Sequence, residues 1–568
     1  MEKRMIIRII GAIMLAATLA LPACCAEGGA IMKSEAGFNV YVVDALTKVF
    51  PDSKLPSGGS AEITVNAARN EYESAQLAVH SDNAIKSLSV DVSMLKGESG
   101  IVPEVKADFV GWVTVSRGSA ETPPEYKIGT IPGKFPDPLT GSKPVAVAAG
   151  MNQPIWLTIH IPADAIPGEY TGIVKVTADS KTVEVPITLK VFTAMVPDKR
   201  TLYVTNWFFT DKIAAAHGVE KWSEGFWKIL GVYAKFMADY RQNTTLTPLT
   251  ELIMGKDDGQ GNYTFDFTRF DRWVELFKGA GVEYIEGSHL GGRGEWEAKD
   301  FDASWPQITK PDGSQVQFPG MKVSSDEERK LLSQYLPALQ KHLEEKGWLD
   351  TYIQHLADEP IPVNAESYKK LSSYVREFAP KFRIMDACQA KEIAGSIDIW
   401  VPLTSEYDHS KDFFVQRQKL GDEVWFYTCL VPKGKYMNRF IDYPLAATRL
   451  IHWTNFMHGV TGYLHWGFNY WPADPYNELE PNWGGESFLP PGDSHIIYPG
   501  KRGPLSSIRM EAMRDGLEDF ELLSLLARKN PKKAHAICDS VIRSMTDYSM
   551  DPKTIRKARL KLLEALED

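Results

Sequence analysis

Residues 351–367 read TYIQHLADEPIPVNAES, a short apolar run that ends in two adjacent acids, Asp358 and Glu359. The run beginning at Thr351 has the length and composition of a buried strand. Pro360 keeps Glu359 out of the helical region and interrupts backbone pairing, and the segment after it has the spacing of an amphipathic helix. The stretch therefore predicts a strand, a turn and a helix, with two carboxyl groups where the strand ends.

The same alternation of strand-like runs and helix-length stretches extends over residues 199–510. Eight such runs begin at Tyr203, Asn243, Val282, Thr351, Arg383, Ile397, Glu423 and Gly462. Eight units of this kind match a catalytic (β/α)8 TIM-like barrel, in which Asp358 and Glu359 end the fourth strand. Because the carboxyl ends of barrel strands form the active face, we expect the catalytic site there.

Two further segments flank the predicted barrel. Residues 30–198 contain short alternating strands separated by Gly and Pro, which is typical of an antiparallel β-sandwich. Residues 511–568 are predicted to form a C-terminal helical extension, and Ser506 or Ser507 is the expected cap of the first helix in this part of the chain. The predicted fold class is therefore α/β with an all-β N-terminal domain.

The first 26 residues have the pattern of an export signal, with basic residues ahead of a short apolar stretch. Residues 21–24, LPAC, resemble a bacterial lipobox, which makes Cys24 the expected site of lipidation. The alternative is ordinary cleavage after Ala26, which would release a soluble periplasmic protein. We expect an exported bacterial protein in the periplasm or at the outer membrane and cell surface, anchored by lipid.

Charge and cysteine content exclude several classes of function. The net charge is −10, and no basic stripe follows the signal, so nucleic acid is not an expected partner. After the signal only Cys388, Cys429 and Cys538 remain, without disulfide-scaffold or zinc spacing. A Cys388–Cys429 bridge and free buried thiols both stay open. We predict no metal and no cofactor, since no second histidine stands at a ligand spacing from His355.

The predicted strand ends are rich in aromatic rings, amides and acids, a mixture that suits carbohydrate. Aromatic rings lie against the apolar faces of sugars, while polar side chains bond the hydroxyl groups. Each aromatic residue has packing in the core as its alternative role. The candidate substrate-binding residues are Asn206, Trp207, His289, Tyr407, Tyr427, Trp466, Asn469 and Tyr470.

The adjacent acids favour one kind of glycosidase. Catalytic carboxyl pairs normally come from different strands, whereas neighbouring acids suit substrate-assisted hydrolysis, in which a 2-acetamido group of the sugar attacks the anomeric carbon. Asp358 would orient the acetamide and stabilise the oxazolinium intermediate. Glu359 would act as general acid and base, with its pKa raised by burial and by the neighbouring Asp358. Alternatively, both acids cap the following helix or pair with lysines.

The order of a sandwich, a barrel carrying HLADEP (355–360), the run YLHWGFNYW (463–471) and the late PLSSIRMEAMRDGLEDFELL (504–523) resembles glycoside hydrolase family 123, the β-N-acetylgalactosaminidases. The resemblance implies a retaining exo-acting enzyme that removes terminal β-linked N-acetylgalactosamine without a metal. It assigns catalysis to Asp358 and Glu359. It also implies an aromatic hydroxyl for the acetamide oxygen, either Tyr407 or Tyr427, and Trp466 as a wall of the sugar pocket.

Two other functions remain open at this stage. One is a β-hexosaminidase with a different sugar preference, and the other is a surface lipoprotein that binds glycans without cleaving them. In each case the expected partner is a glycan or glycoconjugate with a terminal N-acetylhexosamine. Membrane contact is expected only through the lipid anchor.

Overall fold

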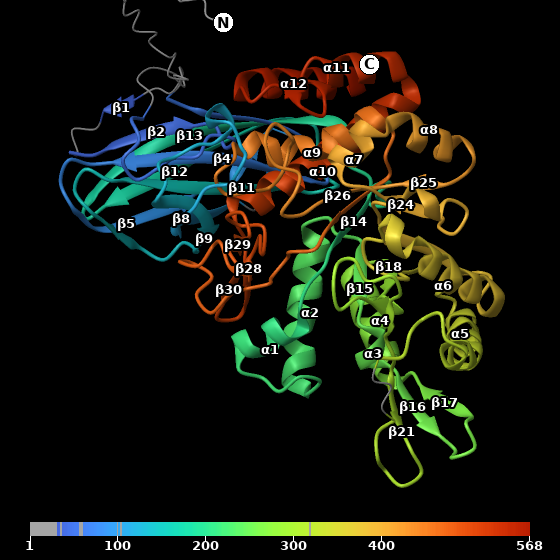
Figure 1. Cartoon of the computed structure of the whole chain (residues 1–568). Helices are drawn as coiled ribbons and strands as arrows, with labels where there is room; N and C mark the ends of the chain where they lie inside the picture. Colours follow the sequence, from blue (N-terminus) through green and yellow to red (C-terminus); the bar gives the residue numbers. More distant parts are fainter. Residues whose placement is uncertain are drawn as a thin grey trace, which may run out of the picture.

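A computed structural model describes residues 31–33, 37–55, 61–98, 100–102, 105–316 and 320–567 (Figure 1). The predicted signal at residues 1–26, with Cys24, lies outside the described residues. The chain forms a β-rich N-terminal domain, then an α/β region, then a group of helices. Within the described residues, no helix combines the length and the apolar character needed to cross a bilayer.

The β-rich domain consists of two sheets that enclose a shared apolar core. The strands of the first sheet, in spatial order, are β1 (Ile31–Lys33), β2 (Asn39–Val43), β4 (Glu71–His80), β11 (Asn152–Ile161), β8 (Val105–Val115) and β9 (Gly133–Leu139). The strands of the second sheet are β10 (Val145–Val147), β5 (Ile85–Val92), β12 (Gly168–Ala178), β13 (Lys181–Met195) and β3 (Ile63–Arg69), with β6 (Leu95–Gly97) and β7 (Gly100–Val102) beside β12.

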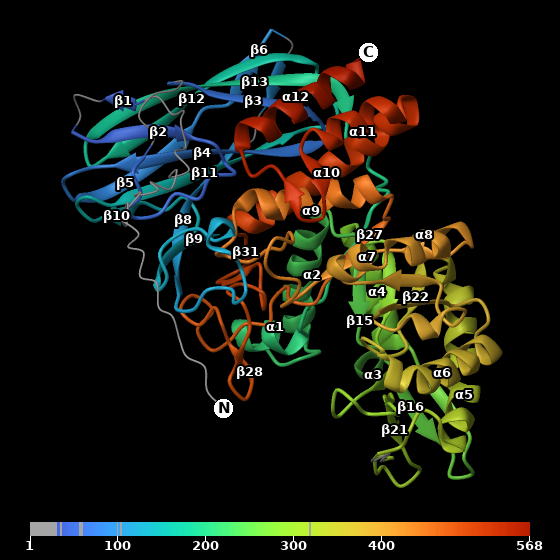
Figure 2. The same ribbon diagram turned by 45° about the horizontal axis from the view of Figure 1, so that its top comes forward.

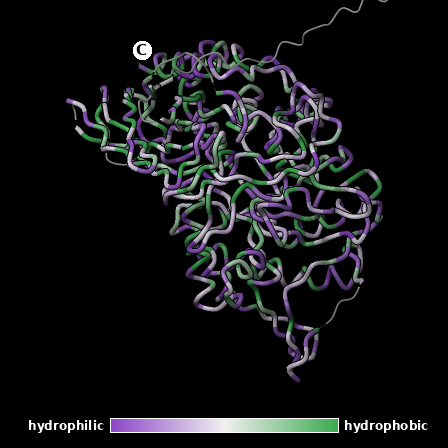
Figure 3. The backbone as a smooth tube through the Cα atoms, turned by 90° about the vertical axis from the view of Figure 1, so that its left-hand side faces the viewer, coloured by the Kyte–Doolittle hydropathy of each residue, from purple (hydrophilic) through white to green (hydrophobic). Residues whose placement is uncertain are grey.

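Alternating hydropathy explains why these segments form a two-layer structure. In β13, buried Val183, Val185, Ile187 and Leu189 alternate with residues that are exposed or only partly buried. Successive side chains of a strand point to opposite faces, so this pattern gives the sheet one apolar face. Figure 3 shows the same alternation of hydrophobic and hydrophilic residues along many segments of the backbone.

The α/β region is built on parallel strands. The strands are β14 (Tyr203–Asn206), β15 (Thr244–Thr247), β18 (Tyr284–Gly287), β22 (Tyr352–Gln354), β23 (Arg383–Ala387), β24 (Ile399–Val401), β25 (Glu423–Val424), β26 (Phe426–Thr428) and β27 (Gly462–His465). One sheet has the order β15-β18-β22-β23-β24-β25, and another has the order β14-β27-β26. Each of the eight predicted runs contains at least one of these strands.

Hydrogen bonds also join the two parallel sheets. The backbone N–H of Asn243, just before β15, donates to the carbonyl oxygen of Val204 in β14 at 3.3 Å. The Asn243 side chain accepts from the N–H of Val204 at 2.8 Å. Since the paired strands are parallel, their carboxyl ends lie at one edge, which is where an α/β protein carries its functional groups.

Helices connect most of these strands and cover them. They are α1 (Thr210–His217), α2 (Glu224–Asp239), α3 (Leu249–Leu252), α4 (Thr268–Ala280), α5 (Asp326–Lys346), α6 (Ala365–Phe378), α7 (Thr404–His409), α8 (Lys411–Lys419) and α9 (Leu445–His458). In α4 the buried residues Phe270, Trp273, Val274 and Phe277 recur at helical spacing, so one face packs on the core. Ser223 caps α2 by accepting from the N–H of Phe226.

Several loops carry short elements of their own. The small strands are β16 (Met254–Asp257), β17 (Tyr263–Asp266), β19 (Gly291–Gly292), β20 (Asp302–Ala303), β21 (Gln307–Thr309), β28 (Asn482–Gly484), β29 (Ser487–Phe488), β30 (Tyr498–Gly500), β31 (Gly503–Leu505), β32 (Ile542–Ser544) and β33 (Asp547–Tyr548). The 3-10 helices are η1 (Pro124–Tyr126), η2 (Leu349–Thr351), η3 (Pro362–Asn364) and η4 (Lys391–Ile393). The long connection between β18 and β22 therefore contains β19, β20, β21 and α5.

The C-terminal helices lie against both other parts of the molecule (Figure 2). They are α10 (Ile508–Lys529), α11 (Pro531–Asp539) and α12 (Pro552–Glu567). Ser507 caps α10 by accepting from the N–H of Met510 at 3.1 Å. The predicted border between residues 510 and 511 therefore falls inside the first turn of α10. This helix packs on α9 and β4, while α12 packs on β13.

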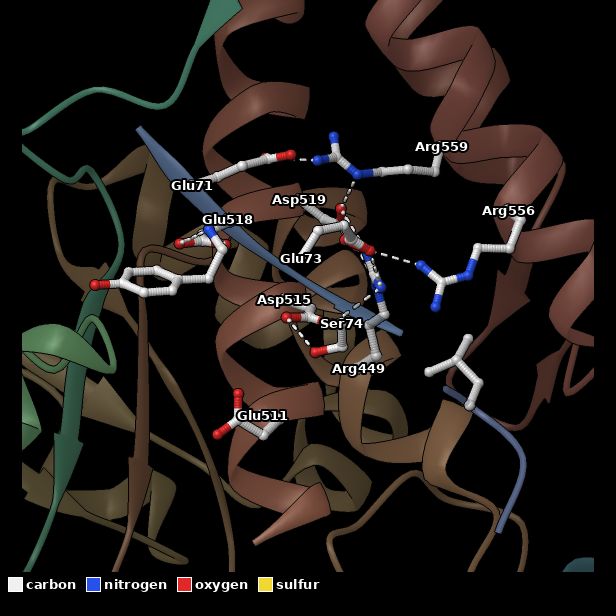
Figure 4. Close-up of polar contacts among 12 residues, drawn as sticks. Glu71, Glu73, Ser74, Arg449, Glu511, Asp515, Glu518, Asp519, Arg556 and Arg559 are labelled. Carbon is white, nitrogen blue, oxygen red and sulfur yellow. Dashed lines mark hydrogen bonds and ion pairs between the residues drawn. The ribbon is translucent and has the colours of Figure 1, made fainter. Parts of the chain in front are cut away.

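A buried cluster of ion pairs joins the three parts of the chain (Figure 4). The Nε of Arg449, on α9, lies 2.7 Å from Asp519 on α10, and its Nη1 lies 3.1 Å from Glu73 on β4. From α12, Arg556 contacts Glu73 at 2.6 Å and Arg559 contacts Asp519 at 2.8 Å. Buried charges are tolerated when they are paired in this way. Separation of the domains would break these ion pairs, so the cluster favours the joined arrangement. A cavity of about 290 Å³ beside it is bounded by β2, β3, β4 and α12, away from the strand ends.

Candidate active site

The backbone changes course where the two adjacent acids occur. β22 stops at Gln354, and Asp358 and Glu359 follow in a bend rather than in the strand. Glu359 has a φ of +46°, a left-handed conformation that is unfavourable for a residue with a side chain. The Nη2 of Arg293 donates to the main-chain oxygens of Asp358 at 2.9 Å and of Glu359 at 2.8 Å. Adjacent residues of a strand point to opposite faces. Because Asp358 and Glu359 lie in a bend secured by Arg293 and not in the strand, this rule does not separate their side chains.

The carboxyl group of Glu359 is held by two side chains. The hydroxyl of Tyr427, at the end of the seventh predicted strand, donates to Oε1, and the amide nitrogen of Gln389 lies 3.4 Å from the same oxygen. Burial and the neighbouring charge of Asp358 raise the pKa of Glu359, while the Tyr427 hydrogen bond and Arg293 lower it. The net shift is upward, which favours a carboxyl group that keeps its proton in weak acid.

Asp358 differs from Glu359 because, among the described residues, no side chain donates a hydrogen bond to its carboxylate. Asp358 is exposed to solvent at the surface of the site. Protein groups close to the carboxyl group nevertheless displace part of its hydration, and this desolvation, followed by the charge of Asp386, raises the pKa of Asp358 to about 6, while the charges of His355 and Arg293 oppose the rise. In the described part of the chain, its hydrogen-bond partner is the backbone N–H of Glu359. The carboxylate can therefore accept a further donor from a ligand.

A buried histidine bridges two acids behind this pair. His355 has its Nε2 2.6 Å from Glu286 and its Nδ1 2.9 Å from Asp386. Burial lowers the pKa of His355, but the hydrogen bonds with Asp386 and Glu286 outweigh it and raise the pKa to about 10. The ring is therefore an imidazolium that donates to a carboxylate from each nitrogen.

Each of the two bridged acids has further donors. Glu286 accepts from the hydroxyl of Thr205 at 2.6 Å and from the indole N–H of Trp207 at 2.7 Å. Asp386 accepts from the backbone N–H of Leu356 at 3.0 Å and from the hydroxyl of Tyr368 at 2.6 Å. The network thus fixes the backbone two residues before Asp358 and orients the Trp207 ring.

His289, His355 and Asp386 also form a group of metal-ligand type, with ligand atoms within 4.8 Å of one another. Both nitrogens of His355 already donate to carboxylates, so the ring has no lone pair to offer a metal. Burial and the charge of His355 lower the pKa of His289 to about 4, so His289 is neutral. The donor set fits a hydrogen-bonded network better than a metal centre.

Several predicted substrate-binding residues lie near the acids. Trp207, Tyr427 and Trp466 contact one apolar cluster formed by residues from β22 to β27. His289 packs edge-on against Trp207, with ring centroids 5.4 Å apart, and Tyr470 lies 5.4 Å from Trp466. Of these five rings, Tyr427 contacts Glu359 directly. Contact of all five with substrate stays a prediction.

Three other predicted substrate-binding residues are occupied by protein contacts. The buried amide of Asn206 accepts from Arg439 at 2.7 Å and donates to Gln242 at 3.2 Å. The buried amide of Asn469 bonds the backbone of Phe209 in both directions.

The third residue, Tyr407, is 1% exposed and lies in α7, where it packs on Phe414 and Phe426. The run starting at Ile397 ends as a strand at Val401 and turns into a helix at Thr404, which carries Tyr407 away from the strand ends. The expectation that Asn206, Asn469 and Tyr407 contact substrate is corrected accordingly. All three support the protein framework.

Three residues that surround the acids were not predicted from the sequence. Arg293 lies in the long loop after the third strand. Asp386 lies near the end of the fifth strand and Glu286 in the third, and neither was predicted to be a site residue. Their position at the ends of neighbouring parallel strands was the available signal.

Comparison with known proteins identifies the family. The model of the glycoside hydrolase 123 catalytic domain matches residues 207–526, and the model of the glycoside hydrolase 123 N-terminal domain matches residues 52–178. The chain belongs to glycoside hydrolase family 123. The predicted family resemblance is thereby confirmed, and the protein is a glycoside hydrolase with a β-rich N-terminal domain followed by an α/β catalytic region.

The chain is also similar to solved structures. The chain is similar to a family 123 glycoside hydrolase from Clostridium perfringens, studied for glycolipid glycan hydrolysis, with 17% identity and a TM-score of 0.72 over 93% of this chain and 97% of that chain. At this identity the likeness shows a shared fold. A GH10 xylanase with a bacterial Ig-like domain, from termite gut, matches at 11% identity and a TM-score of 0.34 over 81% and 100% of the two chains. No curated protein sequence matches.

Proposed function

We propose that this family 123 glycoside hydrolase removes terminal β-linked N-acetylgalactosamine from glycans, with retention of configuration, by substrate-assisted catalysis. One observation carries the proposal: two adjacent carboxyl groups lie at a bend after β22, one held by side-chain donors and the other open to a ligand. The difference between them matches two different tasks, protonating an oxygen and accepting an amide N–H.

In the first step the acetamide oxygen of the substrate attacks the anomeric carbon. The open carboxylate of Asp358 accepts the acetamide N–H, which orients the group and stabilises the positive charge of the oxazolinium ion. Glu359 donates its proton to the glycosidic oxygen as the bond to the leaving group breaks. Tyr427 is already directed at Glu359 and keeps its carboxyl group in one orientation.

In the second step a water molecule attacks the anomeric carbon on the face that the leaving group vacated. Glu359, now ionised, takes a proton from this water, and the bond from the anomeric carbon to the acetamide oxygen breaks. Two inversions at one carbon give overall retention. The cycle returns the proton to Glu359, so the enzyme ends as it began.

The two carboxyl groups influence each other's protonation. Desolvation and the charge of Asp386 raise the pKa of Asp358 to about 6, although the imidazolium of His355 opposes the rise, and burial together with the negative charge of Asp358 raises the pKa of Glu359. An ionised Asp358 beside a protonated Glu359 is the state that the first step needs. Because both pKa values are raised, we expect activity to fall in acid as Asp358 gains a proton and to fall at higher pH as Glu359 loses its proton.

Preference for the galacto sugar rests on the family, and a β-hexosaminidase with a different sugar preference is the nearest alternative. The Clostridium perfringens relative is described in connection with glycolipid glycans, so a glycolipid glycan is one proposed substrate for this chain as well. A surface protein that binds glycans without cleaving them is a weaker alternative, because family membership indicates hydrolysis.

The test uses 2-acetamido-β-galactosides and the matching glucosides with aryl leaving groups. We expect phenol release from the galactoside, loss of release in Glu359→Gln and in Asp358→Asn, and wild-type release in the control Glu406→Gln. Proton NMR at early times should detect the β-anomer of the free sugar. Initial release of the α-anomer, or full activity in Asp358→Asn, would contradict the mechanism.

Three structural predictions remain proposals beside the function. We propose that the parallel strands form one (β/α)8 barrel, which is supported by the hydrogen bonds between Val204 in β14 and Asn243, the residue before β15. We also propose a structural border near residue 198, and export with lipidation at Cys24. Labelling with a fatty acid in a bacterial host, compared between wild type and Cys24→Ser, tests the anchor.

A further inference from the structure

A glutamate in the first turn of α5 is buried without a counter-charge. Glu328 is fully buried, and its Oε2 accepts from the indole N–H of Trp305 at 2.7 Å. Its Oε1 has no hydrogen-bond partner among the described residues. Glutamate is rarely fully buried unless it is paired, and a buried oxygen without a donor lowers stability. The side chain is thus held inside at a cost, which points to a role beyond the stability of the helix.

The start of α5 offers Glu328 another place. Ser325 caps the helix by accepting from the N–H of Glu328 at 3.1 Å. Ser-x-x-Glu is the capping-box pattern, in which the glutamate reaches back to the N–H of the cap residue. Here that N–H donates to the carbonyl oxygen of Lys322 at 3.0 Å. The Glu328 side chain therefore takes no part in the cap and contacts Trp305 instead.

Glu328 carries a proton at neutral pH. Burial raises its pKa to about 8, while the hydrogen bond from Trp305 lowers it. Among the described residues, no charge contributes to this pKa. Tyr335, on the same buried face of α5, packs edge-on against the Trp305 ring, and burial raises the pKa of its hydroxyl as well. A carboxyl group in such surroundings is stable inside the protein only while it is neutral.

The charged groups on and around α5 do not compensate Glu328. Asp326, Glu327 and Lys330 of the same helix are exposed. Other groups on α5 and on the segments packed against it have partners of their own, namely Arg329 with Glu377, Lys322 with Asp302, Asp300 with Ser324 and Ser367, Asp266 with Thr268, and Asp271 with His342 and Lys346. An ionised Glu328 would therefore have the Trp305 indole as its hydrogen-bond donor and no cation beside it.

Trp305 belongs to a segment that returns to the strand ends. It follows β20, which pairs with β19 so that Ala303 lies opposite Gly291. The N–H of Ser304 donates to the carbonyl oxygen of Leu290 at 2.8 Å. Residues 291–303 thus form a closed unit, the β19–β20 ribbon, whose end is attached to α5 through Trp305.

The other side of the β19–β20 ribbon contacts the backbone of the catalytic acids. The N–H of Gly291 donates to the carbonyl oxygen of Leu356 at 2.8 Å, two residues before Asp358. Arg293, the residue after β19, donates to the main-chain oxygens of Asp358 and Glu359. A continuous set of contacts therefore runs from Glu328 through the ribbon to the bend that carries both acids.

We propose that protonated Glu328 and Trp305 are positioning residues for Asp358 and Glu359. Their hydrogen bond fastens the β19–β20 ribbon to α5, and the ribbon holds Arg293 against the main chain of the two acids. When Glu328 loses its proton, its charge favours solvent over the apolar interior, and the ribbon opens. The inference goes beyond the proposed function, which gives neither Glu328 nor Trp305 a role.

Hydrogen exchange tests the ribbon without a substrate. Between the ordinary carboxyl range and about pH 8, the open form is ionised and the closed form is not, so each pH unit lowers the ratio of closed to open ribbon about tenfold. In the wild type, protection of residues 290–305 should fall about 50-fold from pH 6 to pH 8. In Glu328→Gln, whose amide oxygen can still accept from Trp305, protection should stay constant. Glu327→Gln, at an exposed site, is the matched control.

The profile of kcat/KM against pH tests the effect on the acids. The substrate is a 2-acetamido-β-galactoside with a dinitrophenyl leaving group, which departs without a proton, so the acid role of Glu359 does not set the alkaline limb. The wild type and Glu327→Gln should lose activity as the pH rises through about 8. Glu328→Gln should keep its activity, and Trp305→Phe, which lacks the indole N–H, should be less active than the wild type already at pH 6.

Two results would overturn the positioning role. Protection that changes equally with pH in the wild type and in Glu328→Gln, or that is constant in both, would show that Glu328 does not fasten the ribbon. An alkaline limb at the same pH in both proteins would show that the ribbon is merely structural. If no glycoside is hydrolysed, the proposed function fails by itself, and hydrogen exchange still decides whether Glu328 fastens the ribbon.

Discussion

Removing the hydroxyl of Tyr427 should move the pH profile of the enzyme in a defined direction. The hydroxyl donates to Oε1 of Glu359 and stabilises the ionised carboxylate, which lowers its pKa against the upward effects of burial and Asp358. In Tyr427→Phe this opposition is lost. The pKa of Glu359 should rise, and the general acid should keep its proton to higher pH.

The magnitude follows from the strength of the lost bond. A hydrogen bond to a charged group contributes about 1.5–3 kcal/mol, and one pKa unit corresponds to about 1.36 kcal/mol. The Gln389 amide, 3.4 Å from the same oxygen, and the charge of Arg293 remain in the variant. We therefore expect the lower end of the range, a shift of about one pH unit.

The assay measures kcat/KM against pH with a 2-acetamido-β-galactoside that has an alkyl leaving group, since its departure needs a proton. The alkaline limb of the profile reports the pKa of the acid in the free enzyme. Tyr407→Phe is the matched control, because the Tyr407 hydroxyl is buried without a partner among the described residues. An alkaline limb that stays in place in Tyr427→Phe, or moves to lower pH, would refute this role of Tyr427.

Three further predictions concern stability and charge. Glu359→Gly should be more stable than Glu359→Ala by about 0.5–1 kcal/mol in urea unfolding, because glycine accepts a φ of +46° without strain; equal stabilities would argue against a strained bend. His355→Leu should lose about 3–5 kcal/mol of stability, since the buried carboxylates of Glu286 and Asp386 lose their counter-charge. The same substitution should raise the pKa of Asp358, so the acidic limb of the profile of kcat/KM against pH should move to higher pH. An acidic limb that does not move would contradict this prediction. Arg449→Met should cost about 3–5 kcal/mol by leaving the Glu73 and Asp519 carboxylates short of charge, and a loss below about 1 kcal/mol would show that the cluster does not hold the domains together.

The position of the eight strand runs was predictable because each depends on local pattern. Apolar runs of strand length, separated by amphipathic stretches, mark where parallel strands begin and end. The cap of α10 was also predictable, because Ser507 is one of the two serines expected to cap this helix. The domain border between residues 510 and 511 stays a prediction, and it falls inside this helix.

The choice between Tyr407 and Tyr427 shows where local pattern stops being informative. Both tyrosines follow apolar runs of similar composition, and both were candidates for the same role. The first run turns into α7 at Thr404, whereas the second continues as β26 to Thr428. Whether a residue ends a strand or starts a helix depended here on packing against neighbouring elements, which a single sequence does not report.

The sequence by itself determined the family, the order of a β-rich and an α/β part, and the two acids on which the chemistry depends, because each is written in residues that are adjacent or regularly spaced. Only the tertiary structure decided which partners these acids have. Arg293, Asp386 and Tyr427 come from separate loops and strands, and they act on Asp358 or Glu359 because parallel strands bring their carboxyl ends to one edge. The joining of the domains through Arg449 likewise depends on contacts between distant segments, whose pairing energy exists only after folding.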